Sequence, residues 1–473
     1  MKKILTVLLA AAVLCTPATA KKEKKNVTYN EKGEIIKTGL NLGPLPVVAF
    51  DADRGFQFGA LMNIYDFGNG ANYPNPNSQW YIEGSAYVKE SKVGSYKFIL
   101  NYDNKTLIPG VRMSICSGYY KDAALDFYGF NGYQSNYDMG LVGENMKFWD
   151  DKAGQKLQNK FDNKGKLPKG FYRHGRDLVK IKADFTGEIL KNFYWEAGYS
   201  FSWTRTQEFT PKGYTVFGDE SMENGKSLYG LYKSWGIIPE DQADGGFVSA
   251  LKAGLMYDSR NVENNPTKGI WAEGHIIAAP KWLGTSHEHY KYCLTMRQYV
   301  PIVQDKLTFA YRLAYEGTIG KSAPWYTLPF YTNMGIKADN DAFGGYRTVR
   351  GLMLNRVQGL DVGFYNIEMR WRFIDFKLWK QNIAFALSAF TDGTHVFRGY
   401  DMKSYEEVLA VAPGTAEMYK EFVFDRKDGF HGTAGAGLRF IMNQNFIVAF
   451  EGAMPFNRQD GKFAFYLNTG FLF

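Results

Sequence analysis

Strict alternation between large apolar residues and polar or ionised residues limits the fold of this chain more than any other feature. Between residues 364 and 373, every second position is apolar, namely Tyr365, Ile367, Met369, Trp371 and Phe373. The positions between them are polar or charged, namely Asn366, Glu368, Arg370 and Arg372. Because successive side chains of a β-strand point to opposite faces, this stretch predicts a strand with one apolar and one charged face. A soluble core does not accept the charged face, whereas a membrane barrel turns it toward a hydrated lumen.

The same pattern recurs along the chain. It covers residues 193–203, 290–296 and 307–316, and the end of the chain repeats it on the face shared by Phe463, Phe465, Leu467, Phe471 and Phe473. About sixteen such segments fit between Leu45 and Phe473, and single-chain bacterial barrels have an even number of strands. A soluble β-sandwich would also alternate, but large aromatics opposite ionised residues in strand after strand favour the barrel. The sequence therefore predicts an all-β fold, a single transmembrane antiparallel β-barrel of about 16 strands.

The start of the chain is typical of an exported protein. Lys2 and Lys3 precede an apolar run, and Ala18-Thr19-Ala20 is a small-residue cleavage site, so residues 1–20 are predicted to be a signal peptide. Residues 21–43 would then be a short periplasmic extension, and residues 44–473 a barrel without a second domain. We expect a multi-pass β-barrel in the outer membrane of a Gram-negative cell, surrounded by outer-membrane lipids.

The connections between the expected strands differ in length on the two sides of the barrel. Long polar insertions near residues 121–170, 206–245, 318–358 and 394–430 fall at every second connection, so they share one side, which we expect to be the cell exterior. The stretch 68–77 is a long connection on the opposite side, and the pattern offers no reason for it.

The sequence gives little sign of catalytic or cofactor chemistry. It holds no nucleophile elbow, no zinc-protease motif and no phosphate-binding glycine loop, so we expect neither an enzyme nor a cofactor. His287 and His289 could share a face and hold Zn²⁺ or Cu²⁺, but no third ligand is evident, and a solvated loop is the favoured interpretation. Cys116 and Cys293 are expected to be free thiols. The net charge of +8 is spread along the chain, which predicts no nucleic-acid partner.

Several short motifs together resemble one family. Val349-Arg350-Gly351-Leu352 resembles the VRGF/Y motif at the tip of the sixth extracellular loop in the BamA/TamA superfamily, with Leu352 in place of the aromatic residue. Further matches follow the family's order at Tyr257-Asp258-Ser259-Arg260, Pro266-Thr267-Lys268-Gly269, Glu368-Met369-Arg370 and Phe390-Thr391-Asp392-Gly393. The resemblance reaches from the first expected strand to the last and therefore covers essentially the whole mature chain.

This resemblance implies that the long loop folds into the barrel and that Arg350 packs against acidic residues of the wall, Asp392 and Glu368. The implied contact is physically reasonable, because the planar guanidinium fork can bind carboxylates through two hydrogen bonds at once. Gly351 would allow the backbone to turn tightly beside it. The simpler alternative is an arginine exposed on an outer loop.

The resemblance also implies a function. In the family, the first and last strands pair weakly and open as a lateral seam for outer-membrane protein or lipid assembly, which maps onto Leu45, Pro46 and Val47 at one edge and Phe471 and Phe473 at the other. Prolines in the first strand have no backbone donor, which agrees with weak closure. Residues 21–43 are too few for a POTRA domain, so separate periplasmic or outer-membrane accessory proteins are expected. The alternative is a passive pore or a structural surface antigen without assembly activity.

Overall fold

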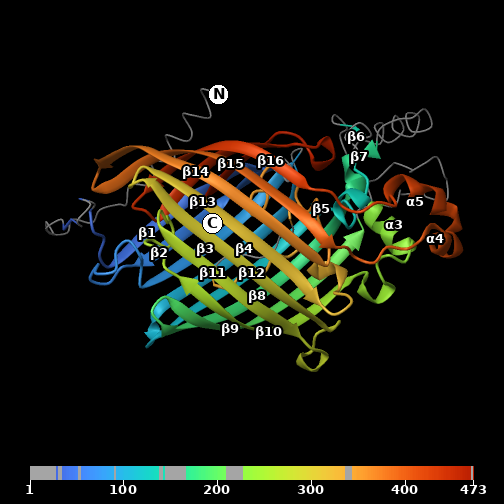
Figure 1. The fold of residues 1–473 in the computed structure, drawn as a ribbon, viewed down its shortest axis with the longest axis horizontal. Helices are drawn as coiled ribbons and strands as arrows, with labels where there is room; N and C mark the ends of the chain where they lie inside the picture. Colours follow the sequence, from blue (N-terminus) through green and yellow to red (C-terminus); the bar gives the residue numbers. More distant parts are fainter. Residues whose placement is uncertain are drawn as a thin grey trace.

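The fold is taken from a computed structural model that describes residues 28–29, 33, 35–51, 55–89, 92–137, 142–143, 167–208, 227–335, 343–469 and 472–473. Sixteen strands form one antiparallel sheet in which neighbours along the chain are neighbours in the sheet. The sheet curls into a barrel (Figure 1). The predicted all-β barrel of about 16 strands is therefore confirmed.

The strands of the first half are β1 (Leu40–Asp51), β2 (Gly55–Asp66), β3 (Ser78–Lys89), β4 (Lys92–Ile108), β5 (Val111–Asp126), β8 (Arg173–Leu190), β9 (Phe193–Glu208) and β10 (Gly245–Asp258). Those of the second half are β11 (Gly269–Ala279), β12 (His289–Val303), β13 (Leu307–Ile319), β14 (Asp361–Leu378), β15 (Gln381–Arg398), β16 (His431–Met442), β17 (Phe446–Pro455) and β18 (Ala464–Thr469). A separate parallel pair, β6 (Val142–Gly143) and β7 (Leu167–Pro168), lies in the loop between β5 and β8. Strand β1 begins a few residues before the expected start of the barrel at residue 44.

The alternation of the sequence separates the two faces of the wall. On β14, the side chains of Met369 and Trp371 are 40% and 51% exposed on the outside, whereas Asn366 and Glu368 of the same strand are fully buried on the inside. The outer face suits lipid, and the inner face needs polar partners, because an isolated charge away from water is costly. The inward-facing polar residues therefore need polar or charged groups in the lumen as partners.

The two ends of the sheet meet without a ladder. Strand β1 pairs only with β2, and β18 pairs only with β17, so these strands stand at the two ends of the sheet order. They nevertheless lie next to one another. Among the described residues, no ladder pairing joins β1 to β18, and β18 has only six residues.

The long connections lie together at one end of the barrel, here called the long-loop end (Figure 1). The helices α3 (Leu228–Ser234), α4 (Tyr405–Val411) and α5 (Ala416–Phe422) belong to these connections. Aromatic residues of the long connections form a buried cluster, here called the aromatic cap, which includes Phe127, Tyr232, Trp235, Trp325 and Tyr419. The ring of Phe127 makes edge-on contacts with the rings of Tyr232 and Trp325, a preferred geometry for aromatic pairs.

The opposite end, here called the short-turn end, carries mostly tight turns. The turn of β8–β9 at Asn192, that of β14–β15 at Trp379 and Lys380, and that of β16–β17 at Asn443 and Gln444 all use positive φ angles. Loop 67–77, for which the sequence offered no reason, lies against the β16–β17 turn, where Asn445 donates a hydrogen bond to the carbonyl of Pro74 at 2.7 Å.

Among the described residues, no helix combines the length and the apolar composition that crossing a bilayer would require.

Candidate functional site

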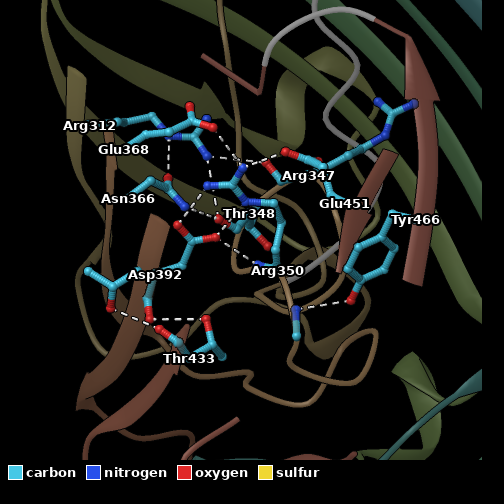
Figure 2. Close-up of polar contacts among 12 residues, drawn as sticks. Arg312, Arg347, Thr348, Arg350, Asn366, Glu368, Asp392, Thr433, Glu451 and Tyr466 are labelled. Carbon is cyan, nitrogen blue, oxygen red and sulfur yellow. Dashed lines mark hydrogen bonds and ion pairs between the residues drawn. The ribbon is translucent and has the colours of Figure 1, made fainter. Parts of the chain in front are cut away.

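The described parts of the connection between β13 and β14, residues 320–335 and 343–360, enter the barrel and are here called the inner loop. At its centre the guanidinium of Arg350 meets three carboxylates from three strands (Figure 2). Its Nε and Nη2 donate to the two oxygens of Asp392 on β15 at 2.8 and 3.0 Å. Its Nη1 donates to Glu451 on β17 at 2.7 Å and to Glu368 on β14 at 3.2 Å. The backbone N–H of Arg350 also donates to Asp392, at 3.0 Å.

Charge is balanced inside this cluster. Arg370 on β14 donates to Glu368 at 2.9 Å, and Arg439 on β16 donates to both Glu368 and Glu451. Burial alone lowers the pKa of Arg350, but the carboxylates of Asp392, Glu451 and Glu368 outweigh burial and raise that pKa well above its usual value. The loop arginine is therefore always a cation, and three carboxylates face three guanidinium groups.

An aromatic ring completes the seat of the guanidinium. The central carbon of the Arg350 guanidinium lies 3.5 Å from the centre of the Phe390 ring, a cation–π distance. Phe390 can occupy this place because the neighbouring strand has Gly435 there. A Cβ atom at Gly435 would lie 2.4 Å from the Phe390 ring and 2.4 Å from a backbone oxygen of Gly452. A strand glycine thus positions the ring on which the loop arginine rests.

The loop turns sharply next to Arg350. Gly351 has a φ of +95°, in the left-handed region that favours glycine, and a Cβ there would come within 3.0 Å of Ala453. The N–H of Gly351 donates to the hydroxyl of Tyr466 on β18 at 3.0 Å (Figure 2). The inner loop is therefore tied to the last strand as well as to β14, β15 and β17.

Val349 and Leu352, the apolar members of the motif, have a packing role. Both are buried, in a cluster with Tyr331, Phe343, Val357, Val362, Phe364 and Val396. Beside them, Asn366 donates to the carbonyl of Thr348 at 2.7 Å and Arg312 donates to the carbonyl of Arg347 at 3.2 Å. The wall thus holds the backbone of the loop as well as its charged tip.

Another part of the inner loop reaches a different side of the barrel. Lys182 on β8 donates to the carbonyl of Asn333 at 2.9 Å, and the N–H of Gly335 donates to Asp184 on the same strand at 3.0 Å. On β13, Glu316 accepts from the N–H of Thr332 at 2.7 Å. Described parts of one loop therefore contact strands on both sides of the lumen.

The sequence profile of the Omp85 superfamily domain matches residues 128–473. This chain belongs to the Omp85 superfamily. As a member it is an outer-membrane β-barrel protein. A comparison with curated proteins finds no match.

Solved structures similar to this Omp85 chain are distant in sequence. A structure of BamA from Haemophilus ducreyi lacking POTRA domains 1–3 has 14% identity and a TM-score of 0.49, over 98% of this chain and 78% of that chain. CdiB from Escherichia coli has 10% identity and a TM-score of 0.49, over 96% of this chain and 68% of that one. CdiB from Acinetobacter baumannii has 10% identity and a TM-score of 0.45, over 93% and 61% of the two chains.

The structure of this Omp85 barrel brings together Arg350, Asp392 and Glu368, as the resemblance implied, and places all three in the lumen. The alternative of an exposed loop arginine is not observed. Sequence reasoning missed Glu451, Arg439 and the Phe390–Gly435 pair. A signal for Glu451 exists, because it is the single ionised residue of the otherwise apolar segment Phe446–Pro455, where it would be expected to face a cation.

The residues expected at the seam of the Omp85 barrel are only partly placed there. Leu45, Pro46 and Val47 lie in β1, with Val47 facing inward and Pro46 facing outward. Phe471 lies outside the described residues. The alternation predicted that Phe473 shares a face with Phe463 and Phe465. This prediction is wrong, because Phe463 and Phe465 lie on the outer face and Phe473 does not.

Instead, Phe473 is 3% exposed and lies inside the lumen. Its carbonyl accepts a hydrogen bond from Arg370 at 3.1 Å, and its ring stacks on Tyr299 of β12. The alternation did not extend to Phe473 because β18 ends at Thr469, so strand geometry no longer decides which way this ring points. The guanidinium groups of Arg312 and Arg370, both within 5.4 Å of the ring centre, stabilise it inside.

The candidate histidine site has other partners in this Omp85 chain. One ring nitrogen of His287 lies 2.9 Å from the hydroxyl of Tyr326 and the other 3.2 Å from Asp241. His289 is buried, with its Nδ1 2.8 Å from the carbonyl of His287. Within the described part of the chain, no group of three or more His, Cys, Asp or Glu side chains is arranged to hold a metal ion.

Proposed function

We propose that this chain is an assembly or translocation factor of a Gram-negative outer membrane and that it works through the lateral seam between β1 and β18. The observation that carries the proposal is that, among the described residues, no ladder joins these adjacent strands, while every other neighbouring pair of strands in the barrel is hydrogen-bonded. Outer-membrane proteins or lipids would be its clients.

The chemistry of the two edges supports a seam that opens. Pro44 and Pro46 contribute no N–H to the edge of β1, and the six residues of β18 offer a short partner. A strand edge that loses its partner when a seam opens is unfavourable in lipid, because its backbone donors and acceptors find no water there. Such an edge is instead a template for another strand, and a client strand can add to it through main-chain hydrogen bonds.

The filled lumen supports a seam over a passive channel. The inner loop occupies the interior with buried ion pairs, and the aromatic cap covers the long-loop end. A client that avoids the lumen has the seam as its route. A pore or a structural surface antigen remains the competing function.

Seam cross-linking in cells depleted of the native protein tests the proposal. Cysteine pairs with one residue from 44–48 and one from 464–468 would join β1 to β18. The control pair, Met62→Cys with Ile82→Cys, joins residues that already face each other on β2 and β3. We expect depletion to lower outer-membrane protein or surface lipid levels. The oxidised seam pair should fail to restore them until a reductant is added, while the control pair restores them in both states.

Two results would contradict the proposal. If depletion leaves outer-membrane proteins and surface lipids normal, with no paralogue present, the assembly role fails and the pore or antigen function is favoured. If the oxidised seam pair restores function fully, the chain acts without opening at the seam. Affinity purification from detergent-solubilised membranes would identify the expected periplasmic or outer-membrane accessory proteins. An enzymatic activity is not part of this proposal.

A further inference from the structure

Three connections meet over the short-turn end of the barrel. They are the loop 67–77 between β2 and β3, the loop 259–268 between β10 and β11, and the turn 443–445 between β16 and β17. Strands β3, β4, β5, β8, β9 and β10 separate the first from the second, and strands β11 to β16 separate the second from the third. Because their roots stand at well-separated points around the ring, these connections can touch only by reaching across the opening.

Each of the three connections contacts the other two. The N–H of Glu263 donates to Asn75 at 3.2 Å, which joins the second connection to the first. Asn264 donates to Asn445 at 2.8 Å and Asn265 donates to Gln444 at 2.5 Å, which join the second to the third. The third is joined to the first by the hydrogen bond from Asn445 to the carbonyl of Pro74.

Loop 259–268 is also held to two strands on the way across. The carboxylate of Glu263 lies 2.5 Å from Lys105 on β4 and 3.3 Å from Arg112 on β5. At its root, Arg260 stacks on the ring of Trp271 at 3.8 Å and donates to the carbonyl of Glu263 at 3.0 Å. Asn265 and Gln444 are nearly buried, although the rim of a barrel is normally wet.

We propose that residues 259–268, here called the strap, close the short-turn mouth of the barrel together with loop 67–77 and turn 443–445, and that the strap must move before a molecule passes between that mouth and the lumen. With the long loops outside the cell, this mouth faces the periplasm. The proposal depends on the membrane barrel but not on activity at the seam.

The type of contact indicates a gate and not a permanent wall. The contacts that cross the opening are mostly between neutral amide groups, each of which contributes modestly because water replaces it readily. The ion pairs of Glu263, in contrast, hold the strap to one side of the rim. The strap can therefore release Asn445 and Gln444 while it stays attached to β4 and β5.

The test measures how fast a reagent reaches the lumen from the short-turn end. Ser114 on β5 is buried, faces the lumen and is close to this rim, so Ser114→Cys places a thiol just inside the strap. The thiol is treated with a membrane-impermeant maleimide in the purified full chain, and peptide mass spectrometry distinguishes it from the native Cys116 and Cys293. No client is required, so the result is independent of the proposed function.

The strap variant combines Glu263→Ala, Asn264→Ala and Asn265→Ala. The control combines Lys191→Ala and Lys306→Ala, two exposed lysines of the same rim that lie outside the strap. We expect the strap variant to react at least about tenfold faster than the parent, because each lost hydrogen bond raises the open population several-fold, and the control to react at the parent's rate. Folding of each variant is checked by heat-modifiable migration on a gel.

Equal labelling of the parent and a folded strap variant would overturn the proposal, whether both are fast or both are slow. If the strap variant does not fold, Gln444→Ala with Asn445→Ala removes the same crossing contacts from the other side and should give the same acceleration. If that variant also fails to fold, the contacts are a structural brace and the gate is rejected.

Discussion

One buried guanidinium, that of Arg350, joins the inner loop to three strands of the wall. It binds both oxygens of Asp392, and it shares Glu368 and Glu451 with Arg370 and Arg439. Removing one member of a buried charged cluster is expensive chiefly because the remaining charges lose their partners. The resemblance and elementary chemistry were enough to predict Arg350, Asp392 and Glu368. Glu451 was missed because, although its lone charge in an apolar segment indicates a facing cation, its place beside Arg350 depends on the register of β16 and β17.

Arg350→Ala should lower the free energy of unfolding by about 3 to 5 kcal/mol, since buried Asp392 loses the guanidinium bound to both its oxygens, and Glu368 and Glu451 keep only Arg370 and Arg439. Arg350→Lys should recover only part of the loss, because an ammonium group cannot reproduce the two-oxygen contact with Asp392. The measurement is the temperature at which the folded form disappears on a gel. Arg347→Ala, on the same loop but only half-buried, is the control. Equal effects at both positions would mean that burial of Arg350 is not what matters.

Gly435→Ala tests the packing of the Phe390 ring that contacts the guanidinium of Arg350. The added Cβ would clash with the Phe390 ring and the backbone of β17, so we expect a loss of about 1 to 3 kcal/mol, typical of overpacking. The control is Gly414→Ala, where nothing lies within 4 Å and φ is not positive, and it should leave stability unchanged. The half-unfolding temperature compares the two variants, and a Gly435→Ala protein as stable as the parent contradicts the proposed packing.

At the scale of strands and loops, the sequence was informative where the period of two applies. Alternation predicted the faces of β14 because lipid and lumen act on every second residue alike. It could not predict that loop 67–77 meets residues such as Asn445, because contacts between distant loops leave no repeating pattern. The helices α3, α4 and α5 were also not foreseen, since they are only seven residues each and lie inside long polar insertions.

The strap should have a characteristic dependence on pH. Burial raises the pKa of Glu263, but the cations of Arg112, Lys105 and Arg260 outweigh burial and lower that pKa to about 2, from an ordinary 4.5. A carboxyl with a depressed pKa in the folded state stabilises the fold above its unfolded pKa and loses this effect as pH falls. The gap in half-unfolding temperature between the parent and Glu263→Gln should be constant above pH 4.5 and close toward pH 2.

Glu406→Gln, at an exposed position of α4, provides the comparison for that pH series. Its half-unfolding temperature should differ little from that of the parent at any pH. A gap for Glu263→Gln that stays constant down to pH 2 would contradict the assigned ion pairs with Lys105 and Arg112.

For the molecule as a whole, two barriers lie one behind the other along the axis of the barrel. The inner loop and the aromatic cap fill the long-loop end, and the strap crosses the short-turn end. Ions can cross the barrel only when both barriers are open at the same time. The barrel therefore differs from a porin, whose lumen is a continuous aqueous channel.

Planar-bilayer recordings should reflect this arrangement. We expect the parent to be almost silent, and Arg350→Ala or the strap variant alone to open only briefly. The combination should stay open longer than either variant alone, because both barriers are weakened. Lys191→Ala with Lys306→Ala should behave like the parent. Steady conductance by the parent that survives Arg350→Ala unchanged would instead indicate a passive pore.

The depth at which Arg350 is held also decides how the protein responds to dissolved salt. At physiological ionic strength, mobile ions weaken attraction between charges over about 8 Å, but only where those ions can approach. The ion pair between Lys403, which precedes α4, and Glu407 on α4 is about half exposed to solvent, so it will weaken as sodium chloride is added. The guanidinium of Arg350 has no exposed surface, so its ion pair with Asp392 should be equally strong at low and at high salt concentration.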